Sequence, residues 1–206
     1  MNKENIILIG AGGHALSCID VIEQENKYKI YGLVGLKDEI GKKISGYDVI
    51  ASDDELTSLV KEIKYALITL GQIKNVDQRV KLFSRVNELG FNLPAIISPY
   101  SYVSQHSEIG IGTIIMHGAI VNFGAKIGYN CVINSRALVE HGTQIANHCH
   151  ISTGAILNGD CIVESKSFVG SGAIVKHGVT IKTNSFVNMG QIVTKNFDNL
   201  NNLARE

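Results

Sequence analysis

The segment Ile109-Gly-Ile-Gly-Thr-Ile-Ile-Met-His-Gly-Ala-Ile-Val121 decides the fold, because an aliphatic residue returns in it at every sixth position. A small residue usually follows four places later, with Val179 and Gln191 as the larger exceptions. A period of six fits neither an α-helix nor simple alternation, so we predict that each hexad is a short strand and a corner with its aliphatic side chain inside. The aliphatic positions are Val103, Ile109, Ile115, Val121, Ile127, Ile133, Val139, Ile145, Ile151, Leu157, Val163, Val169, Val175, Ile181, Val187 and Val193.

This array resembles that of the hexapeptide-repeat acyltransferases. The resemblance implies a left-handed parallel β-helix of triangular section with three hexads per coil, although parallel crossovers are generally right-handed. About five coils then fit between Val103 and Lys195. Residues eighteen apart stack at roughly 4.8 Å. One predicted column contains Phe123, His141, Gly159 and His177.

The first half of the chain has a different pattern, in which short apolar runs alternate with segments of helical spacing. This β-α-β series predicts a small Rossmann-like α/β domain at residues 1–99, before an all-β domain of β-helix at residues 100–206. Pro94 and Pro99 bracket the transition. The predicted strands are 6–9, 30–34 and 65–70, and the predicted helices are 15–25, 53–61 and 76–89.

Composition excludes several classes of function. Lys plus Arg and Asp plus Glu number 19 each, so the zero net charge gives no reason to expect a nucleic-acid partner. No run near the start is long enough for a signal peptide or a membrane insertion, and we expect a cytoplasmic protein. The four cysteines form no Cys-x-x-Cys pair and are expected to be reduced packing residues.

The segment from Asn134 to Ala155 carries a second, more specific resemblance. Its Glu-His step and later His-Ile-Ser-x-Gly run are similar to those of sugar acetyltransferases of the NeuD (sialic acid O-acetyltransferase) and PglD (UDP-amino-sugar N-acetyltransferase) type. The resemblance implies acetyl-CoA as acyl donor, a homotrimer with sites between neighbours, and His141 as general base. It also implies donor contacts from His150, Gly154, Ala155 and Gly159, the last through a backbone N–H at the oxyanion.

The physical requirement agrees with this role for His141, because attack on a thioester needs a neutral imidazole to take a proton from an amine or hydroxyl. Two departures from the family pattern stand out. Gly142 replaces the acidic residue that often follows the base, and Glu140 precedes it instead. The Val-Pro-Ala-Lys-like closing run is also missing. The histidines are scattered over different hexad positions, so no metal site is expected.

The turn after the first predicted strand reads Gly10-Ala-Gly-Gly-His-Ala15. Such glycines let a backbone approach a phosphate at the start of a helix, so Gly10, Gly12 and Gly13 are predicted to bind a nucleotide. The resemblance adds His14, close to the reaction centre, as a further substrate contact. In similar transferases this pocket holds a UDP-sugar. Gly35 stands where those enzymes have an Asp, which makes Asp38 the candidate contact, and Gly71 matches a glycine that lines the pocket.

Three functions remain open. The first is acetyl-CoA-dependent N-acetylation of a nucleotide-linked amino sugar of the UDP-4-amino-sugar type, with His141 and Glu140 as the catalytic residues. The second is O-acetylation of a sialic-acid-type sugar by the same base. The third is a non-catalytic scaffold that binds a nucleotide sugar, which Gly142 and the missing closing run would fit.

Overall fold

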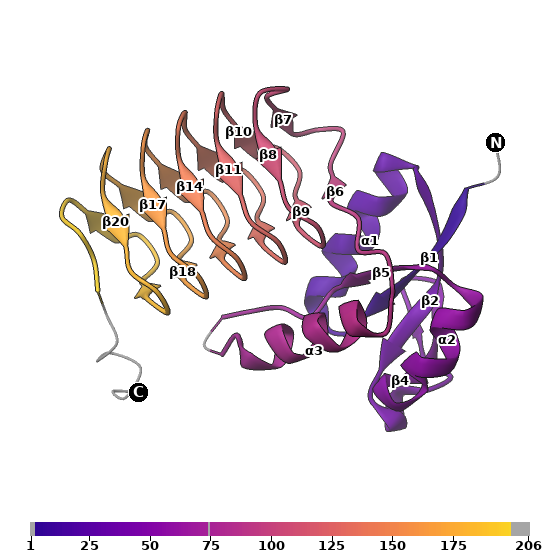
Figure 1. Cartoon of the computed structure of the whole chain (residues 1–206). Coiled ribbons are helices and arrows are strands. Elements are labelled where there is room, and N and C mark those ends of the chain that lie inside the picture. Colours follow the sequence, from indigo (N-terminus) through magenta and orange to yellow (C-terminus); the bar gives the residue numbers. More distant parts are fainter. Residues whose placement is uncertain (1–2, 74, 199–206) are drawn as a thin grey trace.

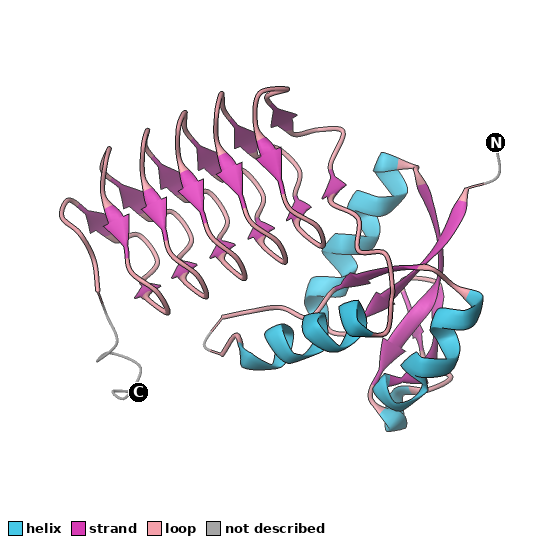
Figure 2. Ribbon diagram, viewed as in Figure 1, coloured by secondary structure: helices cyan, strands magenta, loops and turns pink. Residues whose placement is uncertain are grey.

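A computed structural model describes residues 3–73 and 75–198. It contains two parts of different architecture, an α/β part and a long stack of coils (Figure 1). In the part of the chain that the structure describes, helices occur in the first part, whereas the second consists of short strands and turns (Figure 2). Among the described residues, no helix combines the length and the apolar character that crossing a membrane requires.

The α/β part is built on a five-stranded sheet of order β3-β4-β2-β1-β5. All neighbours are parallel except β3 and β4. Along β1, Ile6 and Leu8 face one side and Ile7 and Ile9 the other, and all four are buried, as expected of a central strand covered on both faces. The strands are β1 (Glu4–Ile9), β2 (Tyr28–Gly35), β3 (Lys43–Ile44), β4 (Tyr47–Ser52) and β5 (Tyr65–Ile68).

The sequence interpretation missed the hairpin of β3 and β4. Its turn consists of Ser45 and Gly46, both with positive φ (48° and 89°), which is the mark of a two-residue type I′ hairpin. Tyr47, Val49 and Ala51 alternate with more exposed residues along β4. This alternation was the available signal, but it is short and lies in a stretch rich in charged residues.

Helix α1 (Gly13–Glu25) packs between the sheet and the β-helix. Its buried residues Cys18 and Ile22 share a cluster with Ile114 and Val132 of the coils, so one apolar core joins the two parts. The opposite face of the sheet is covered by α2 (Leu56–Glu62) and α3 (Asp77–Glu88). The three helices begin and end within three residues of the predicted ranges. Two short 3-10 helices, η1 (Lys37–Glu39) and η2 (Asp53–Glu55), complete this part.

The second part is a parallel β-helix whose two-residue strands form three sheets. Strands three apart in order pair in register, as Ile120 does with Leu138, so the predicted eighteen-residue stacking is confirmed. Strand β6 (Ile96–Ile97) already pairs with β9. We name the sheets by their strands: C is β21-β18-β15-β12-β9-β6, D is β22-β19-β16-β13-β10-β7 and E is β20-β17-β14-β11-β8.

The remaining strands follow every six residues. They are β7 (Tyr102–Val103), β8 (Glu108–Ile109), β9 (Ile114–Ile115), β10 (Ile120–Val121), β11 (Lys126–Ile127), β12 (Val132–Ile133), β13 (Leu138–Val139), β14 (Gln144–Ile145), β15 (His150–Ile151), β16 (Ile156–Leu157), β17 (Ile162–Val163), β18 (Phe168–Val169), β19 (Ile174–Val175), β20 (Thr180–Ile181), β21 (Phe186–Val187) and β22 (Ile192–Val193). The second residue of each strand points into the interior, where it packs with the small residues of the corners. These corner residues include Cys131, Cys149 and Cys161, whose thiols are free and buried.

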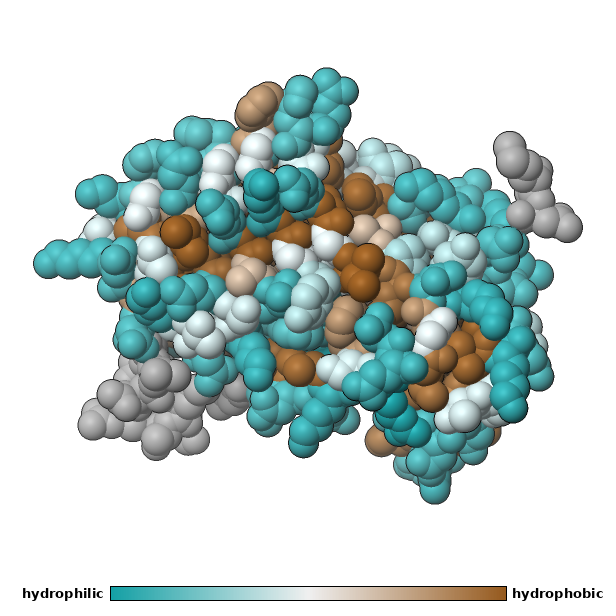
Figure 3. Space-filling model, in the orientation of Figure 1, coloured by the Kyte–Doolittle hydropathy of each residue, from teal (hydrophilic) through white to brown (hydrophobic). Residues whose placement is uncertain are grey.

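The outward residues differ between the sheets. On sheet E they include Glu108, Lys126 and Gln144, whereas on sheet D they are all apolar or aromatic. The sheet D column is Tyr102, Ile120, Leu138, Ile156, Ile174 and Ile192. Figure 3 shows hydrophilic residues over most of one face of the molecule, with a band of apolar groups along the β-helix.

Candidate active site

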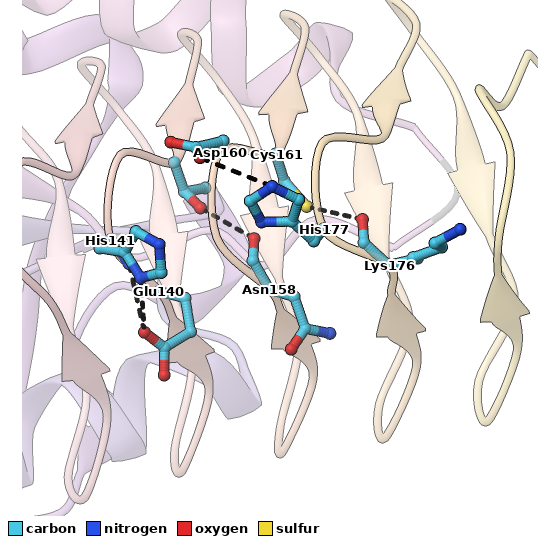
Figure 4. Close-up of polar contacts among 8 residues, drawn as sticks. Glu140, His141, Asn158, Asp160, Cys161, Lys176 and His177 are labelled. Atoms are coloured by element: carbon cyan, nitrogen blue, oxygen red, sulfur yellow. Dashed lines mark hydrogen bonds and ion pairs between the residues drawn. The ribbon is translucent and has the colours of Figure 1, made fainter.

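His141 lies at the corner where the chain passes from sheet D to sheet E, between β13 and β14. Its Nδ1 atom is 3.4 Å from Oε2 of Glu140, and 62% of its side chain is exposed (Figure 4). Successive residues of a strand point to opposite faces, but this alternation ends where the chain turns after Val139, so Glu140 can reach the ring. With a carboxylate at Nδ1, the neutral imidazole keeps its proton there and leaves Nε2 free to accept one.

Gly159 is one coil above His141, as predicted, and faces the other edge of the ring. A Cβ atom added at Gly159 would lie 2.6 Å from Nε2 of His141, closer than side chains pack. Gly159 has no positive φ, so its corner conformation does not require glycine. Its backbone N–H donates to no group among the described residues. The position therefore leaves room at Nε2, and its free N–H is available to a ligand.

Gly142 has a structural reason to be glycine. It belongs to a set of corner residues with positive φ that recur every six residues, and its φ is +67°. Asp160 occupies the equivalent corner one coil higher, and a Cβ atom at Gly142 would overlap Oδ1 of Asp160. Asp160 therefore fills the space beside His141 that a side chain at Gly142 would occupy.

Asp160 and His177 give the column a property that was not predicted. Polar atoms of His141, Asp160 and His177 lie within 4.8 Å of one another, a spacing within reach of a metal ion. The expectation that the histidines would not converge is therefore wrong for this corner. It overlooked Asp160, which is not in the predicted column but adjoins it.

A groove of about 650 Å³ begins at His141 and continues toward the first coils. Its walls come from three successive corners between sheets D and E, and include Tyr102, His106, Asn122 and Phe123. The rings of His106 and Phe123 are 4.5 Å apart. The groove is open and mixed in polarity, so it can admit a solvated ligand.

His150 lies elsewhere, on the outward side of sheet C against the α/β part. It is 6% exposed, its Nδ1 donates to the carbonyl of Gln72 at 2.7 Å, and Asn134 contacts its Nε2 at 3.2 Å. The ring of His14, at the start of α1, is 6.5 Å from that of His150. These contacts favour a neutral ring that helps to join the two parts. The structure does not bring His150 to the corner of His141.

We call the group of His14, Gln72, Arg79, His148 and His150 the junction cluster. Arg79 is fully buried and donates to the carbonyls of Ile68 and Leu70, while its Nε and Nη2 have no partner among the described residues. Burial, with Arg79 as a further cause, lowers the pKa of His14 to about 3 and that of His148 to about 4. Burial also lowers the pKa of His150 to about 4. These histidines are held neutral.

The glycine turn has the form that its sequence predicted. Gly10 has φ +119° and lies against the backbone of Leu70, where a Cβ atom would be 2.8 Å from the amide nitrogen. Gly12 caps α1 without a side-chain hydrogen bond, and the first turn of the helix contains no acidic residue. This helix end is therefore open to an anion. Gly71 faces His14, with 3.5 Å between its added Cβ and the Cβ of His14.

Two acidic residues follow the end of β2, the predicted contact Asp38 and its neighbour Glu39. Asp38 is exposed on η1. Glu39 instead turns back, so that its Oε2 accepts the N–H of Leu36 at 2.8 Å and would lie 2.7 Å from a Cβ atom at Gly35. The same added Cβ would be 3.1 Å from Ala11 of the glycine turn. Sequence reasoning missed Glu39 because it counted only along the strand.

Gly154 and Ala155 lie at the corner between sheets C and D, away from the corner of His141. Gly154 has φ +65°, and Ala155 is buried in the interior of the coils. Their local structure is thus explained by the turn and the core.

Comparisons with known proteins agree with this architecture. The family model of the PglD N-terminal domain matches residues 5–86. PerB from Caulobacter crescentus, solved with CoA and GDP-perosamine, is 27% identical, with a TM-score of 0.87 over 94% of this chain and 90% of that one. The acetyltransferase domain of PglB from Neisseria gonorrhoeae, solved with acetyl coenzyme A, is 26% identical, with a TM-score of 0.88 over 96% and 94%. No curated protein sequence matches the chain significantly.

WeeI from Acinetobacter baumannii, at 24% identity, matches in fold over 93% of this chain and 92% of that one, with a TM-score of 0.82. The predicted fold class, an α/β domain followed by a left-handed β-helix, is confirmed by these matches. The resemblance inferred from the sequence is confirmed as well: residues 5–86 match the PglD N-terminal domain, and the chain is an acyltransferase similar to sugar N-acetyltransferases of the hexapeptide type.

Proposed function

We propose that the chain transfers an acetyl group from acetyl-CoA to the amine of a nucleotide-linked amino sugar, with His141 as general base. The observation that carries the proposal is the geometry of His141, which has Glu140 at Nδ1 and the bare backbone of Gly159 at Nε2. The solved relatives support it, since one holds CoA with GDP-perosamine and another holds acetyl coenzyme A.

In the proposed reaction the sugar amine attacks the thioester carbonyl while Nε2 of His141 accepts its proton. The N–H of Gly159, which has no acceptor among the described residues, is proposed to donate to the developing oxyanion. Glu140 keeps the proton on Nδ1 and stabilises the imidazolium that forms. Collapse of the tetrahedral intermediate breaks the carbon–sulfur bond, and the imidazolium returns the proton to the leaving thiolate.

The nucleotide is proposed to bind at the glycine turn, with its diphosphate at the start of α1 and its ribose near Glu39. Glu39 replaces Asp38 in this role because its carboxylate adjoins Gly35 and Ala11. The UDP form was the first expectation, and the GDP-sugar bound by PerB makes a GDP form an equal candidate. The predicted contacts of His150, Gly154 and Ala155 with the coenzyme stay predictions.

A homotrimer is part of the proposal. The apolar column of sheet D is open in the single chain, with Ile120 40% and Ile192 68% exposed. A surface of this kind is usually covered by a partner, and sheet D borders the corner of His141. We expect the chain to sediment at the mass of three copies. The variant Ile174→Glu should sediment as a smaller species, whereas Thr180→Glu, on sheet E, should sediment as the wild type does. The cytoplasmic location stays a prediction.

The activity test is release of CoA thiol from acetyl-CoA with matched acceptors. We expect turnover with a UDP- or GDP-linked 4-amino sugar and little with the corresponding hydroxyl sugar or free sialic acid. Turnover only with a hydroxyl acceptor would replace N-acetylation by O-acetylation. Absence of thiol release with every acceptor, together with measurable binding of a nucleotide sugar, would leave the scaffold as the better description.

A further inference from the structure

Three successive coils place metal-type ligands at one corner. His141 comes from the β13–β14 corner, Asp160 from β16–β17 and His177 from β19–β20 (Figure 4). Nε2 of His177 is 3.7 Å from Oδ2 of Asp160, and the rings of His141 and His177 are 6.4 Å apart at 41°. All three side chains are exposed, with 58% to 63% of their surface accessible.

Two glycines keep the space among these side chains open. Gly159 lies between His141 and His177 in the column and has no side chain to separate the imidazoles. At Gly142, a side chain would occupy the place of the Asp160 carboxylate. The ligand atoms of the three groups therefore lie within 4.8 Å of one another, and neither glycine places a side chain between them.

The distances suit a small divalent cation after modest rotation of the side chains. Zinc binds imidazole nitrogen and carboxylate oxygen at about 2.0–2.2 Å, so ligand atoms around a tetrahedral ion lie roughly 3.4 Å apart. The observed ligand atoms lie within 4.8 Å of one another. Two nitrogens and one carboxylate with an open side toward solvent form a donor set that zinc accepts, whereas calcium and magnesium prefer oxygen alone.

We propose that His141, Asp160 and His177 form a binding site for Zn²⁺, and that the bound ion blocks the base. Coordination through Nε2 of His141 uses the lone pair that must accept the proton of the substrate amine, so zinc acts as an inhibitor. The inhibition rests on the proposed acetyl transfer, whereas the metal site does not. His177 serves the metal site without a part in the reaction.

Binding is tested first, without reference to activity. Metal-free protein is titrated with ZnCl₂ in a calorimeter and with Co²⁺ by visible absorption. We expect one ion per chain, with affinity at least about tenfold weaker for His177→Asn and Asp160→Asn, because even outer-shell changes reduce metal affinity by that much. His106→Asn, which removes an exposed groove histidine outside the cluster, should bind as the wild type does.

Activity is tested next, in buffer treated with chelator. Wild type and His177→Asn should have equal rates without metal, and zinc should inhibit the wild type at concentrations at least about tenfold lower. Failure of the wild type to bind zinc, or equal affinity in His177→Asn, overturns the site. Equal zinc inhibition of both proteins overturns the link to the base. An inactive chain that still binds zinc through His177 contradicts only the proposed function.

Discussion

The molecule uses histidine in two opposite environments. At the corner between sheets D and E, His141 and His177 are exposed and have carboxylates beside them. In the junction cluster, His14, His148 and His150 have the cationic Arg79 nearby. A ring in the first setting is open to solvent and to a ligand, whereas burial holds a ring in the second neutral. Position in the fold therefore separates the catalytic candidate from the structural histidines.

The largest expected effect comes from removing the exposed His141, the proposed base. Substitution His141→Ala should lower kcat by at least about 100-fold, the usual contribution of a general base. Binding of CoA and of the nucleotide sugar, measured by calorimetry, should change little because the ring lies at the reacting end of the groove. A wild-type kcat for His141→Ala would contradict the proposal that the exposed His141, unlike the buried histidines, takes part in the reaction.

Changes in the junction cluster should affect the free energy of unfolding rather than kcat. Because the folded-state pKa of His150 is about 4, below the ordinary 6.5, the unfolded chain binds the proton more readily as the pH falls. The contribution of His150 to the free energy of unfolding is therefore fully present above pH 6.5 and declines as the pH falls toward 4, by about 1.4 kcal/mol per pH unit at most. Urea unfolding between pH 7 and pH 5 measures this slope.

For this measurement His150→Gln is the test variant and the exposed His106→Gln is its control. The first should reduce the dependence of the unfolding free energy on pH, and the second should leave it as in the wild type. Equal slopes for all three proteins would contradict the assignment of His150 as a buried neutral ring.

A smaller effect is expected at Gly159, where one methyl group would press on Nε2 of His141. Gly159→Ala should lower kcat by about tenfold, the effect of about 1.4 kcal/mol on the barrier, with little change in KM. Gly172→Ala is the matched change, since Gly172 has φ +67° and no neighbour within 4 Å of an added Cβ. It should cost about 1 kcal/mol of stability and leave kcat unchanged. Equal kcat values for the two variants would remove the role of Gly159.

The smallest effect concerns Glu140. Its contact with His141 is long, at 3.4 Å, and partly exposed, and such pairs are worth at most about 1 kcal/mol. Glu140→Gln should therefore lower kcat by no more than about fivefold. A loss as large as that of His141→Ala would indicate a stronger coupling between the two side chains than the geometry suggests.

The repeat made most of the fold predictable, because a hexad period leaves few ways to bury its aliphatic residues. The stack of His141, Gly159 and His177 followed directly from the eighteen-residue coil. Other features depend on side-chain directions that no linear pattern reveals. Examples are the return of Glu39 toward Gly35, the reach of Glu140 around a corner, and the burial of His150 against Gln72.

The Gly142 and Asp160 pair extends this lesson to the comparison of relatives. In a stacked coil a side chain has neighbours eighteen positions away that are as close as the next residue in the chain. A carboxylate absent at one position, as at Gly142, can therefore stand at the same corner of the adjacent layer, as Asp160 does within 4.8 Å of His141, and a motif written as consecutive letters does not include it. Comparisons of related sequences should therefore include positions eighteen residues apart in adjacent coils, where Asp160 is found.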